Sequence, residues 1–211
     1  MNPVGVPKII QTLYPNRVWQ IPVASKEIFL TFDDGPIPEV TPWVLEQLKR
    51  YNAKATFFCI GENIKKHQQI FEAILSEGHQ VGNHTYNHLN GWKTSHLEYL
   101  ENTKKAWRLI TDQAPNKNIQ KYFRPPYGKM THRQAAALRN EGYQLIMWSI
   151  LSYDYDSNTS ETTCLSNVLE NSQPGKIIVF HDSKKAERNL RYTLPKVLET
   201  LSREGYTFKT I

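Results

Sequence analysis

Two adjacent carboxylates precede a turn in the stretch Thr31-Phe32-Asp33-Asp34-Gly35-Pro36. Side chains of neighbouring residues in an extended strand point to opposite faces, so Asp33 and Asp34 can converge only if the chain turns there. Gly35-Pro36 supplies such a turn immediately afterwards. By itself this pair is as consistent with two solvated turn aspartates as with a catalytic base and a metal ligand.

A spaced pair of histidines occurs in His84-Thr85-Tyr86-Asn87-His88. Histidines at positions i and i+4 share a face if the segment is helical, close enough to bind one metal ion. Together with Asp34 they would give three protein ligands and leave positions open for water, as a catalytic metal site requires. The alternative is ordinary surface histidines, since the chain has seven histidines in all.

Three further segments carry polar groups after apolar runs. They are the stiff loop of residues 124–128, which begins with Arg124; the aromatic and acidic stretch of residues 148–156; and His181, which follows the apolar run of residues 176–180. Arg124 could pair with a carboxylate of the first segment. Alone, His181 is better explained as a histidine packed at a strand end. All five segments nevertheless fall at predicted strand ends on one edge of a sheet, where parallel α/β proteins place their active sites.

The elements that position these residues alternate between strands and helices. Strands are predicted over residues 27–34, 55–60, 79–82, up to 123, 144–150, 176–180 and 206–210, and helices over 40–51, 63–77, 95–111, 131–140, 159–170 and 194–203. About seven alternations without a break in composition predict one α/β domain, a closed or nearly closed (β/α) barrel, with an open doubly wound sheet as the alternative. Residues 1–25 are expected to form an irregular lead-in and residues 26–211 the domain.

Composition and missing motifs narrow the function. The 211 residues are 39% hydrophobic and 22% charged, and the net charge is +6, but the basic residues are scattered, so nucleic-acid binding is not expected. Two cysteines are too few for a disulfide framework. The dinucleotide, P-loop and serine-hydrolase motifs are absent. No segment resembles a membrane span or a secretory signal, so we expect a soluble, cytoplasmic protein, or one acting at the cell envelope if a signal has been removed.

Taken together, the motifs resemble those of the polysaccharide deacetylase family, also called the NodB-homology domain. The match covers residues 26–211 and consists of an ordered set: TFDDGP at 31–36, HTYNH at 84–88, RPPYG at 124–128, the tryptophan-to-aspartate stretch at 148–155, and VFH at 179–181. The family's fold is a distorted (β/α) barrel, in keeping with the predicted elements.

The resemblance also implies roles for individual residues. Asp33 would be the general base, oriented by Arg124, and His181 the general acid, adjusted by Asp154. Asp34, His84 and His88 would hold a divalent metal, for which zinc is the first expectation and cobalt or nickel would also fit. The remaining expected residues line the substrate groove: Tyr127, Trp148, Tyr155 and Val179. Tyr127 would also contribute its backbone N–H to the oxyanion.

Three residues depart from the family pattern. Tyr155 stands where a tryptophan often follows the aspartate, Leu151 where another acid is common, and Val179 where leucine is usual. These positions would shape the pocket for the acetyl methyl group, so they bear on the substrate more than on the chemistry.

The expected activity is removal of N-acetyl groups from an N-acetylglucosamine-type polysaccharide or oligosaccharide, which would be the protein's partner. Three alternatives stay open on the residues alone. They are an esterase acting on O-acetyl groups such as those of acetylated xylan, a non-catalytic carbohydrate-binding domain, and an amide hydrolase acting on a small non-sugar substrate. Water attack with acid assistance serves both amides and esters, so the motifs do not separate them.

Overall fold

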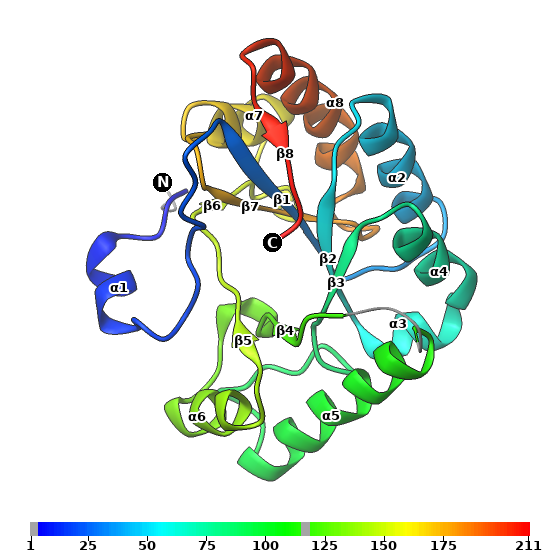
Figure 1. Ribbon diagram of the computed structural model, residues 1–211, viewed down its shortest axis with the longest axis vertical. Helices are drawn as coiled ribbons and strands as arrows, with labels where there is room; N and C mark the ends of the chain where they lie inside the picture. The colour runs from blue at the N-terminus through cyan, green and yellow to red at the C-terminus, as the bar shows by residue number, and fades with distance from the viewer. Residues whose placement is uncertain (1–3, 115–118) are drawn as a thin grey trace.

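Parallel strands form a curled sheet at the centre of the molecule, and helices cover its outer side (Figure 1). The computed structural model describes residues 4–114 and 119–211. The strands are β1 (Glu27–Asp33), β2 (Ala55–Cys59), β3 (Gln80–Asn83), β4 (Tyr122–Phe123), β5 (Gln144–Leu145), β6 (Ile150–Leu151), β7 (Ile177–His181) and β8 (Thr207–Phe208). Their order is β5-β4-β3-β2-β1-β7-β6, and β8 pairs with the beginning of β1.

The sheet curls into a barrel whose two edge strands, β5 and β6, are not neighbours in the sheet. The N-terminal segment runs along this gap, where isolated bridges join Gly5 to Ile150, Val18 to Ile146 and Gln20 to Lys176. The prediction of a distorted (β/α) barrel in a single domain is therefore confirmed. The doubly wound alternative is wrong, because such a sheet would carry helices on both faces.

Alternation along the strands sends apolar side chains outward and the reactive ones inward. In β1, Ile28, Leu30 and Phe32 belong to the large core between sheet and helices. Phe29 belongs to a smaller apolar cluster inside the barrel. Successive side chains on a strand alternate, so Thr31 and Asp33 share the inward face with Phe29. Each fully buried apolar side chain contributes about 1.5–3 kcal/mol, so the outer core fixes which face of β1 points inward.

The helices are α1 (Lys8–Leu13), α2 (Val40–Arg50), α3 (Gly61–Lys66), α4 (Gln68–Ser76), α5 (His96–Asp112), α6 (His132–Asn140), α7 (Glu161–Leu169) and α8 (Glu187–Arg203). Helices α2 to α8 lie between successive strands on the outside of the barrel, and α1 precedes β1. Three of them begin after hydroxyl residues whose side chains accept a backbone N–H from the first turn: Ser95, Thr131 and Ser160. Among the described residues, no helix is long and apolar enough to cross a bilayer.

Some predicted boundaries were wrong. The helix predicted over 63–77 is two helices, because His67 has a non-helical backbone between α3 and α4. The strand predicted over 144–150 is two short strands, β5 and β6. The last helix begins at Glu187 rather than at 194. The lead-in of residues 1–25 contains α1, and its first three residues lie outside the described residues; the domain boundary at residue 26 stays a prediction.

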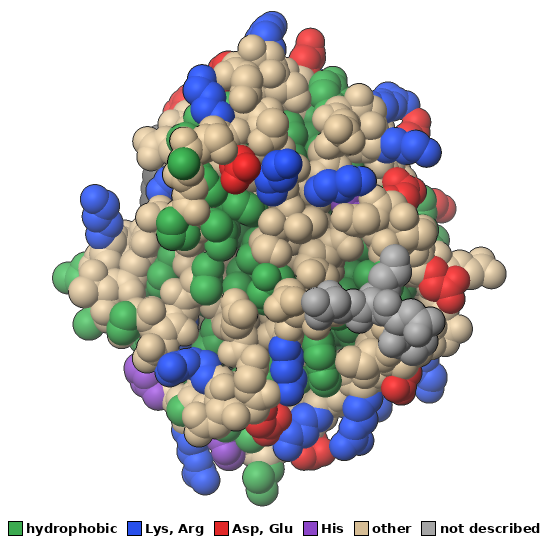
Figure 2. Space-filling view, viewed as in Figure 1, with side chains coloured by type: hydrophobic (Ala, Val, Ile, Leu, Met, Phe, Trp, Pro, Cys, Tyr) green, Lys and Arg blue, Asp and Glu red, His purple; other side chains and the backbone are tan. Residues whose placement is uncertain are grey.

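The amino ends of the strands are covered by the C-terminal segment. The backbone N–H of Ile211 donates to Thr56 Oγ1 at 3.0 Å, and the Ile211 side chain packs against the apolar cluster inside the barrel. The C-terminus lies in the middle of the view in Figure 1, and hydrophobic side chains gather at the centre of the same face in Figure 2. The carboxyl ends of the parallel strands therefore open at the other end of the barrel, where the motif residues lie.

Candidate active site

The turn after β1 brings both aspartates to the same cleft. Asp33 is the last residue of β1 and faces inward, whereas Asp34 has a φ of 82°, in the left-handed region that non-glycine residues rarely adopt. The left-handed backbone at Asp34 turns the chain, so that the side chains of both aspartates reach the cleft. The turn is held by Asn63, whose Nδ2 donates to the Asp34 carbonyl at 2.8 Å, and by Asp182, whose Oδ1 accepts the Gly35 N–H at 3.0 Å.

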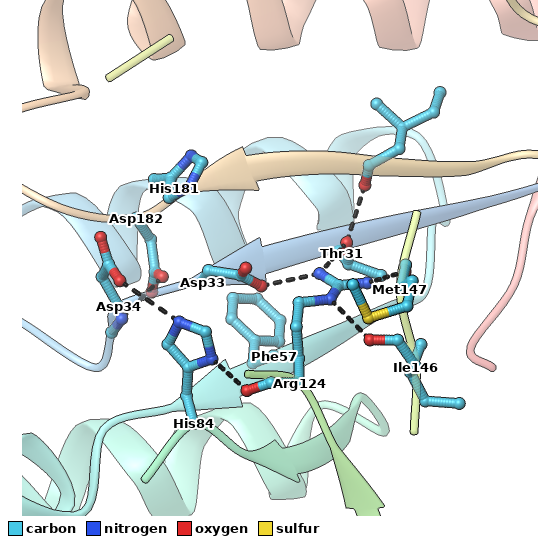
Figure 3. Close-up of polar contacts among 12 residues, drawn as sticks. Thr31, Asp33, Asp34, Phe57, His84, Arg124, Ile146, Met147, His181 and Asp182 are labelled. Atoms are coloured by element: carbon cyan, nitrogen blue, oxygen red, sulfur yellow. Dashed lines mark hydrogen bonds and ion pairs between the residues drawn. The ribbon is translucent and has the colours of Figure 1, made fainter. Parts of the chain in front are cut away.

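Asp33 forms a buried ion pair with Arg124, which follows β4 (Figure 3). Arg124 Nη1 donates to Asp33 Oδ1 and to Thr31 Oγ1, both at 2.7 Å. Nε and Nη2 donate to the carbonyls of Ile146 and Met147 at 3.3 and 2.8 Å. The guanidinium is fully buried, and every one of its nitrogens has an acceptor, so its position is fixed. One carboxylate oxygen of Asp33 is thus held by Arg124.

Asp34, His84 and His88 converge on one point. Asp34 Oδ1 lies 3.2 Å from His88 Nε2 and 3.7 Å from His84 Nε2, yet this buried oxygen has no hydrogen-bond partner. The ligand atoms of the three residues all lie within 4.8 Å of one another. A buried carboxylate oxygen without a hydrogen-bond partner costs folding free energy, unless a bound cation takes the place of the missing donor. The three residues therefore fit a metal ion.

The outer ring nitrogens of both histidines are engaged elsewhere. His84 Nδ1 lies 2.7 Å from the Arg124 carbonyl, which only accepts, so Nδ1 carries the hydrogen and Nε2 keeps its lone pair. His88 Nδ1 lies 3.1 Å from the Tyr127 hydroxyl. Burial lowers the pKa of His84 to about 4, which keeps its ring neutral at pH 7, the form that binds metals. One carboxylate and two imidazoles suit zinc and also cobalt or nickel.

His181, the last residue of β7, is held by Asp154 from the loop after β6. Asp154 Oδ2 accepts the backbone N–H of His181 and Oδ1 contacts its Nδ1, both at 2.7 Å. Burial alone would lower the pKa of His181, but the Asp154 carboxylate, together with the charges of Asp34 and Asp33, raises that pKa to about 9. At neutral pH the ring is therefore protonated and can donate from Nε2.

A cleft of about 520 Å³ contains these groups and the residues expected to bind substrate. Its lining is Asp33, Asp34, His84, His88, Pro125, Tyr127, Gly128, Lys129, Trp148, Leu151, Tyr155, Val179, His181 and Lys185. Tyr127 packs against the His88 ring at 4.6 Å and Tyr155 against the His181 ring at 4.8 Å, measured between ring centroids. Expected base, acid, ligands and groove residues thus meet in one place, with Arg124 and Asp154 directly behind them.

Backbone strain is concentrated in the loops of this cleft. Five non-glycine residues in the motif loops have positive φ: Asp34, Thr85, His88, Tyr127 and Tyr153. Such conformations cost about 1–3 kcal/mol each and persist only where the surrounding structure enforces them, which is typical of functional sites. The segment with His84 and His88 is not helical, so helical spacing is not what brings the two rings together. A strained loop after β3 does so instead.

Two aromatic residues near the motifs lie outside the cleft lining. Tyr86 is buried, and the Lys105 ammonium lies 3.6 Å from the centre of its ring. Trp92 is 65% exposed, and its Nε1 donates to the Met130 carbonyl at 3.1 Å.

Comparison with known proteins assigns the chain to a family. The sequence model of the family described as polysaccharide deacetylase matches residues 20–146, more than half of the chain. The chain belongs to the polysaccharide deacetylase family. The matched residues carry the first three motifs of this deacetylase family.

Relatives within the polysaccharide deacetylase family include two proteins of Bacillus cereus, each named a peptidoglycan-N-acetylglucosamine deacetylase. One is 36% identical over 194 residues, which are 90% of this chain and 68% of the relative. The other is 34% identical over 194 residues, 92% of this chain and 90% of the relative. The crystal structure of the Bc1960 peptidoglycan N-acetylglucosamine deacetylase, in complex with a naphthalenyl-N-oxidanyl-benzamide, matches with a TM-score of 0.88 and 33% identity over 98% of this chain and 95% of that chain.

Several residues of the candidate site were not predicted from the sequence. Asp182 holds the turn after β1, and its Oδ2 accepts the Thr41 hydroxyl at 2.6 Å, but an acid next to a candidate histidine gave no separate signal. Thr31 accepts a hydrogen bond from Arg124, but in the sequence nothing distinguishes it from an ordinary strand residue. Lys129 and Lys185 line the cleft, although they lie just beyond the motifs at 124–128 and 179–181.

Proposed function

We propose that this chain is a divalent-metal-dependent deacetylase that removes the acetyl group from N-acetylglucosamine units of a peptidoglycan-type polysaccharide. The observation that carries the proposal is the convergence of Asp34, His84 and His88 in a cleft that Asp33 and His181 also line. Support comes from the two relatives named for this activity. Such a polymer belongs to the cell wall, so the proposal places the reaction at the cell envelope.

Asp33 is the proposed general base. Arg124 holds Oδ1, which leaves Oδ2 to take a proton from the water that attacks the acetamide carbonyl. Thr31 Oγ1 donates to the Ile178 carbonyl at 2.8 Å while it accepts from Arg124, and so ties the Asp33–Arg124 pair to the sheet.

Asp34, His84 and His88 are the proposed metal ligands. A divalent ion bound there would lower the pKa of the attacking water and polarise the acetamide carbonyl. His84 donates its Nδ1 hydrogen to the Arg124 carbonyl, which orients its ring and keeps Nε2 available. The Tyr127 hydroxyl contacts Nδ1 of His88 and orients that ring in the same way. The backbone N–H of Tyr127 is the proposed donor to the oxyanion.

His181 is the proposed general acid. Asp154 holds the ring from Nδ1, so a protonated His181 presents Nε2–H to the cleft and can donate it to the departing nitrogen. The carbon–nitrogen bond then breaks, and acetate and a free amino sugar are released. The proposed walls for the sugar and the acetyl methyl group are Tyr127, Trp148, Tyr155 and Val179, and Leu151 also lines the cleft.

Acetate release from two substrates tests this function. Metal-loaded protein should release acetate from N-acetylglucosamine oligomers and from peptidoglycan, and prolonged chelation should abolish release until a divalent ion is restored. Release from acetylxylan alone would show an O-acetyl esterase instead. A protein that binds the oligomers but releases no acetate from any of these substrates would be a carbohydrate-binding domain. A protein that neither binds the oligomers nor releases acetate from any of these substrates would favour the remaining alternative, a hydrolase of small non-sugar amides.

A further inference from the structure

Two lysines in the cleft have no acidic partner. Lys129 and Lys185 both line the cleft, and neither forms an ion pair with any residue of 4–114 or 119–211. Lys184, the neighbour of Lys185, behaves differently because it pairs with Glu39 and Glu187. Of the two acids that line the cleft, Asp33 is paired with Arg124, and Asp34 lies against the two histidines of the proposed metal site rather than against a lysine. The positive charge of both lysines is therefore uncompensated inside the cleft.

The two lysines flank the reactive groups from opposite sides. Lys129 follows β4 and Lys185 follows β7, and β1, which carries Asp33, lies between these strands in the order β4-β3-β2-β1-β7. Each ammonium lies over an aromatic ring. Lys129 Nζ is 5.2 Å from the centre of the exposed Trp92 ring and Lys185 Nζ is 5.5 Å from that of Tyr155, which packs on His181.

This combination of charges and rings suits one class of ligand. Aromatic faces stack on sugar rings, and an ammonium beside such a face can meet an anionic substituent of the same or the next sugar. A lysine is a point charge on a flexible stem, so it can follow a carboxylate whose position varies along a polymer. Positive groups in a cleft also concentrate anionic substrates. A neutral oligosaccharide would make no use of either ammonium group.

We propose that the cleft selects an acidic acetylated glycan, in which carboxylate-bearing sugars flank the sugar that is deacetylated, and that Lys129 and Lys185 are the residues that select it. The inference rests on the proposed deacetylase function and adds the substrate class to it. The carboxylates contact the lysines on either side of the acetamide, while the acetamide itself sits between Asp33 and His181. Neither lysine takes part in the hydrolysis.

The test compares one tetrasaccharide in two forms. The first is an alternating N-acetylglucosamine and N-acetylmuramic acid tetrasaccharide with free carboxylates, and the second has those carboxylates converted to methylamides. The variants are Lys129→Met, Lys185→Met, their double variant and Lys184→Met. Lys184→Met is the matched control, because it removes one positive charge next to the cleft from a lysine that already has acidic partners.

Binding and turnover are both measured. The wild type should favour the acidic form in kcat/KM, and each cleft lysine variant should lose about two- to fivefold on that form, as expected for a partly exposed ion pair. The loss should be absent for the methylamide form and for Lys184→Met. Added salt should weaken wild-type binding of the acidic form and leave binding by the double variant nearly unchanged. Replacement of each lysine by arginine should retain most of the preference.

Two results would overturn the proposal. Equal losses on the acidic and neutral forms would show that the lysines only shape the cleft, and no preference of the wild type for the acidic form would show that their charge is not used. Calorimetric binding to both tetrasaccharides is measured with Asp33→Asn, which is expected not to turn them over. A missing deacetylase activity would therefore appear in the acetate assay, whereas a missing charge preference would appear in binding.

Discussion

Asp33 and His181 are register partners on the neighbouring parallel strands β1 and β7. The next residue, Asp182, donates its backbone N–H to the Asp33 carbonyl at 3.0 Å. Neighbouring strands lie about 4.8 Å apart, so the sheet itself fixes the spacing between the proposed base and the proposed acid. The metal ligands, in contrast, come from the strained loops that follow β1 and β3.

Asp33→Asn should keep the fold and the metal but lose turnover. An asparagine oxygen can still accept from Arg124, but the amide is not a base, so kcat should fall by about 10²- to 10⁴-fold. Acetate release and metal content are measured on the same sample. Asp112→Asn, a change at an exposed carboxylate, serves as the control and should leave kcat unaltered. A metal-loaded Asp33→Asn protein with wild-type kcat would remove Asp33 from the mechanism.

Asp154→Asn should move the alkaline limit of activity. Burial lowers the pKa of His181, but the Asp154 carboxylate, with smaller contributions from Asp34 and Asp33, raises it to about 9. The acid must be protonated, so wild-type activity should decline as pH rises through about 9. Without the negative charge the pKa falls, and the decline should begin roughly one to two pH units lower. The measurement is kcat/KM from pH 6 to pH 10. An unchanged alkaline limb would mean that His181 is not the titrating acid.

Tyr127→Phe should weaken metal binding. The change removes the hydroxyl that lies 3.1 Å from His88 Nδ1. Loss of such an outer partner typically costs ten- to a hundredfold in metal affinity, and water can partly replace this exposed hydroxyl, so we expect about tenfold. Competition with a chelator gives the affinity without any need for activity. Tyr51→Phe, which lies outside the cleft, should bind the ion like the wild type; equal affinities for all three proteins would contradict the role of Tyr127.

Gly35→Ala should destabilise the protein. A Cβ at this position would lie 2.0 Å from Asp182 Oδ2 and 2.5 Å from its Cγ, so the buried carboxylate or the turn must move. Such overpacking costs about 1–3 kcal/mol of the free energy of unfolding. Denaturant unfolding of the metal-free protein measures this loss. Gly5→Ala, whose Cβ would meet nothing nearer than 3.5 Å, should change stability by less than about 0.5 kcal/mol. Equal stabilities would show that the turn is not packed against Asp182 in solution.

Local patterns were enough to predict most of the barrel. The apolar strands β1, β2 and β7 were found within one residue of each end, because their outward faces build the main core. The strand predicted over 144–150 was wrong because the chain between β5 and β6 uses the carbonyls of Ile146 and Met147 to accept from Arg124. That demand comes from another part of the sequence, so no local pattern could reveal it.

The start of the last helix illustrates a second limit. The helix predicted over 194–203 begins seven residues earlier, at Glu187. Leu190 and Leu194 are both buried in the main core. Their packing extends the start of α8 to Glu187, so Pro195 lies inside the helix. In the site, the motif positions predicted which residues gather in the cleft. The unpaired state of Lys129 and Lys185 depends on which acids are engaged elsewhere, and only the folded structure gives that information.

Anomalous diffraction from crystals grown with Zn²⁺ would locate the metal ion relative to Asp34, His84 and His88. We expect one ion between the Asp34 carboxylate and the Nε2 atoms of His84 and His88, at about 2.0–2.2 Å from each. Zinc bound only at other residues, or absent from this point in a protein that still releases acetate, would contradict this expectation.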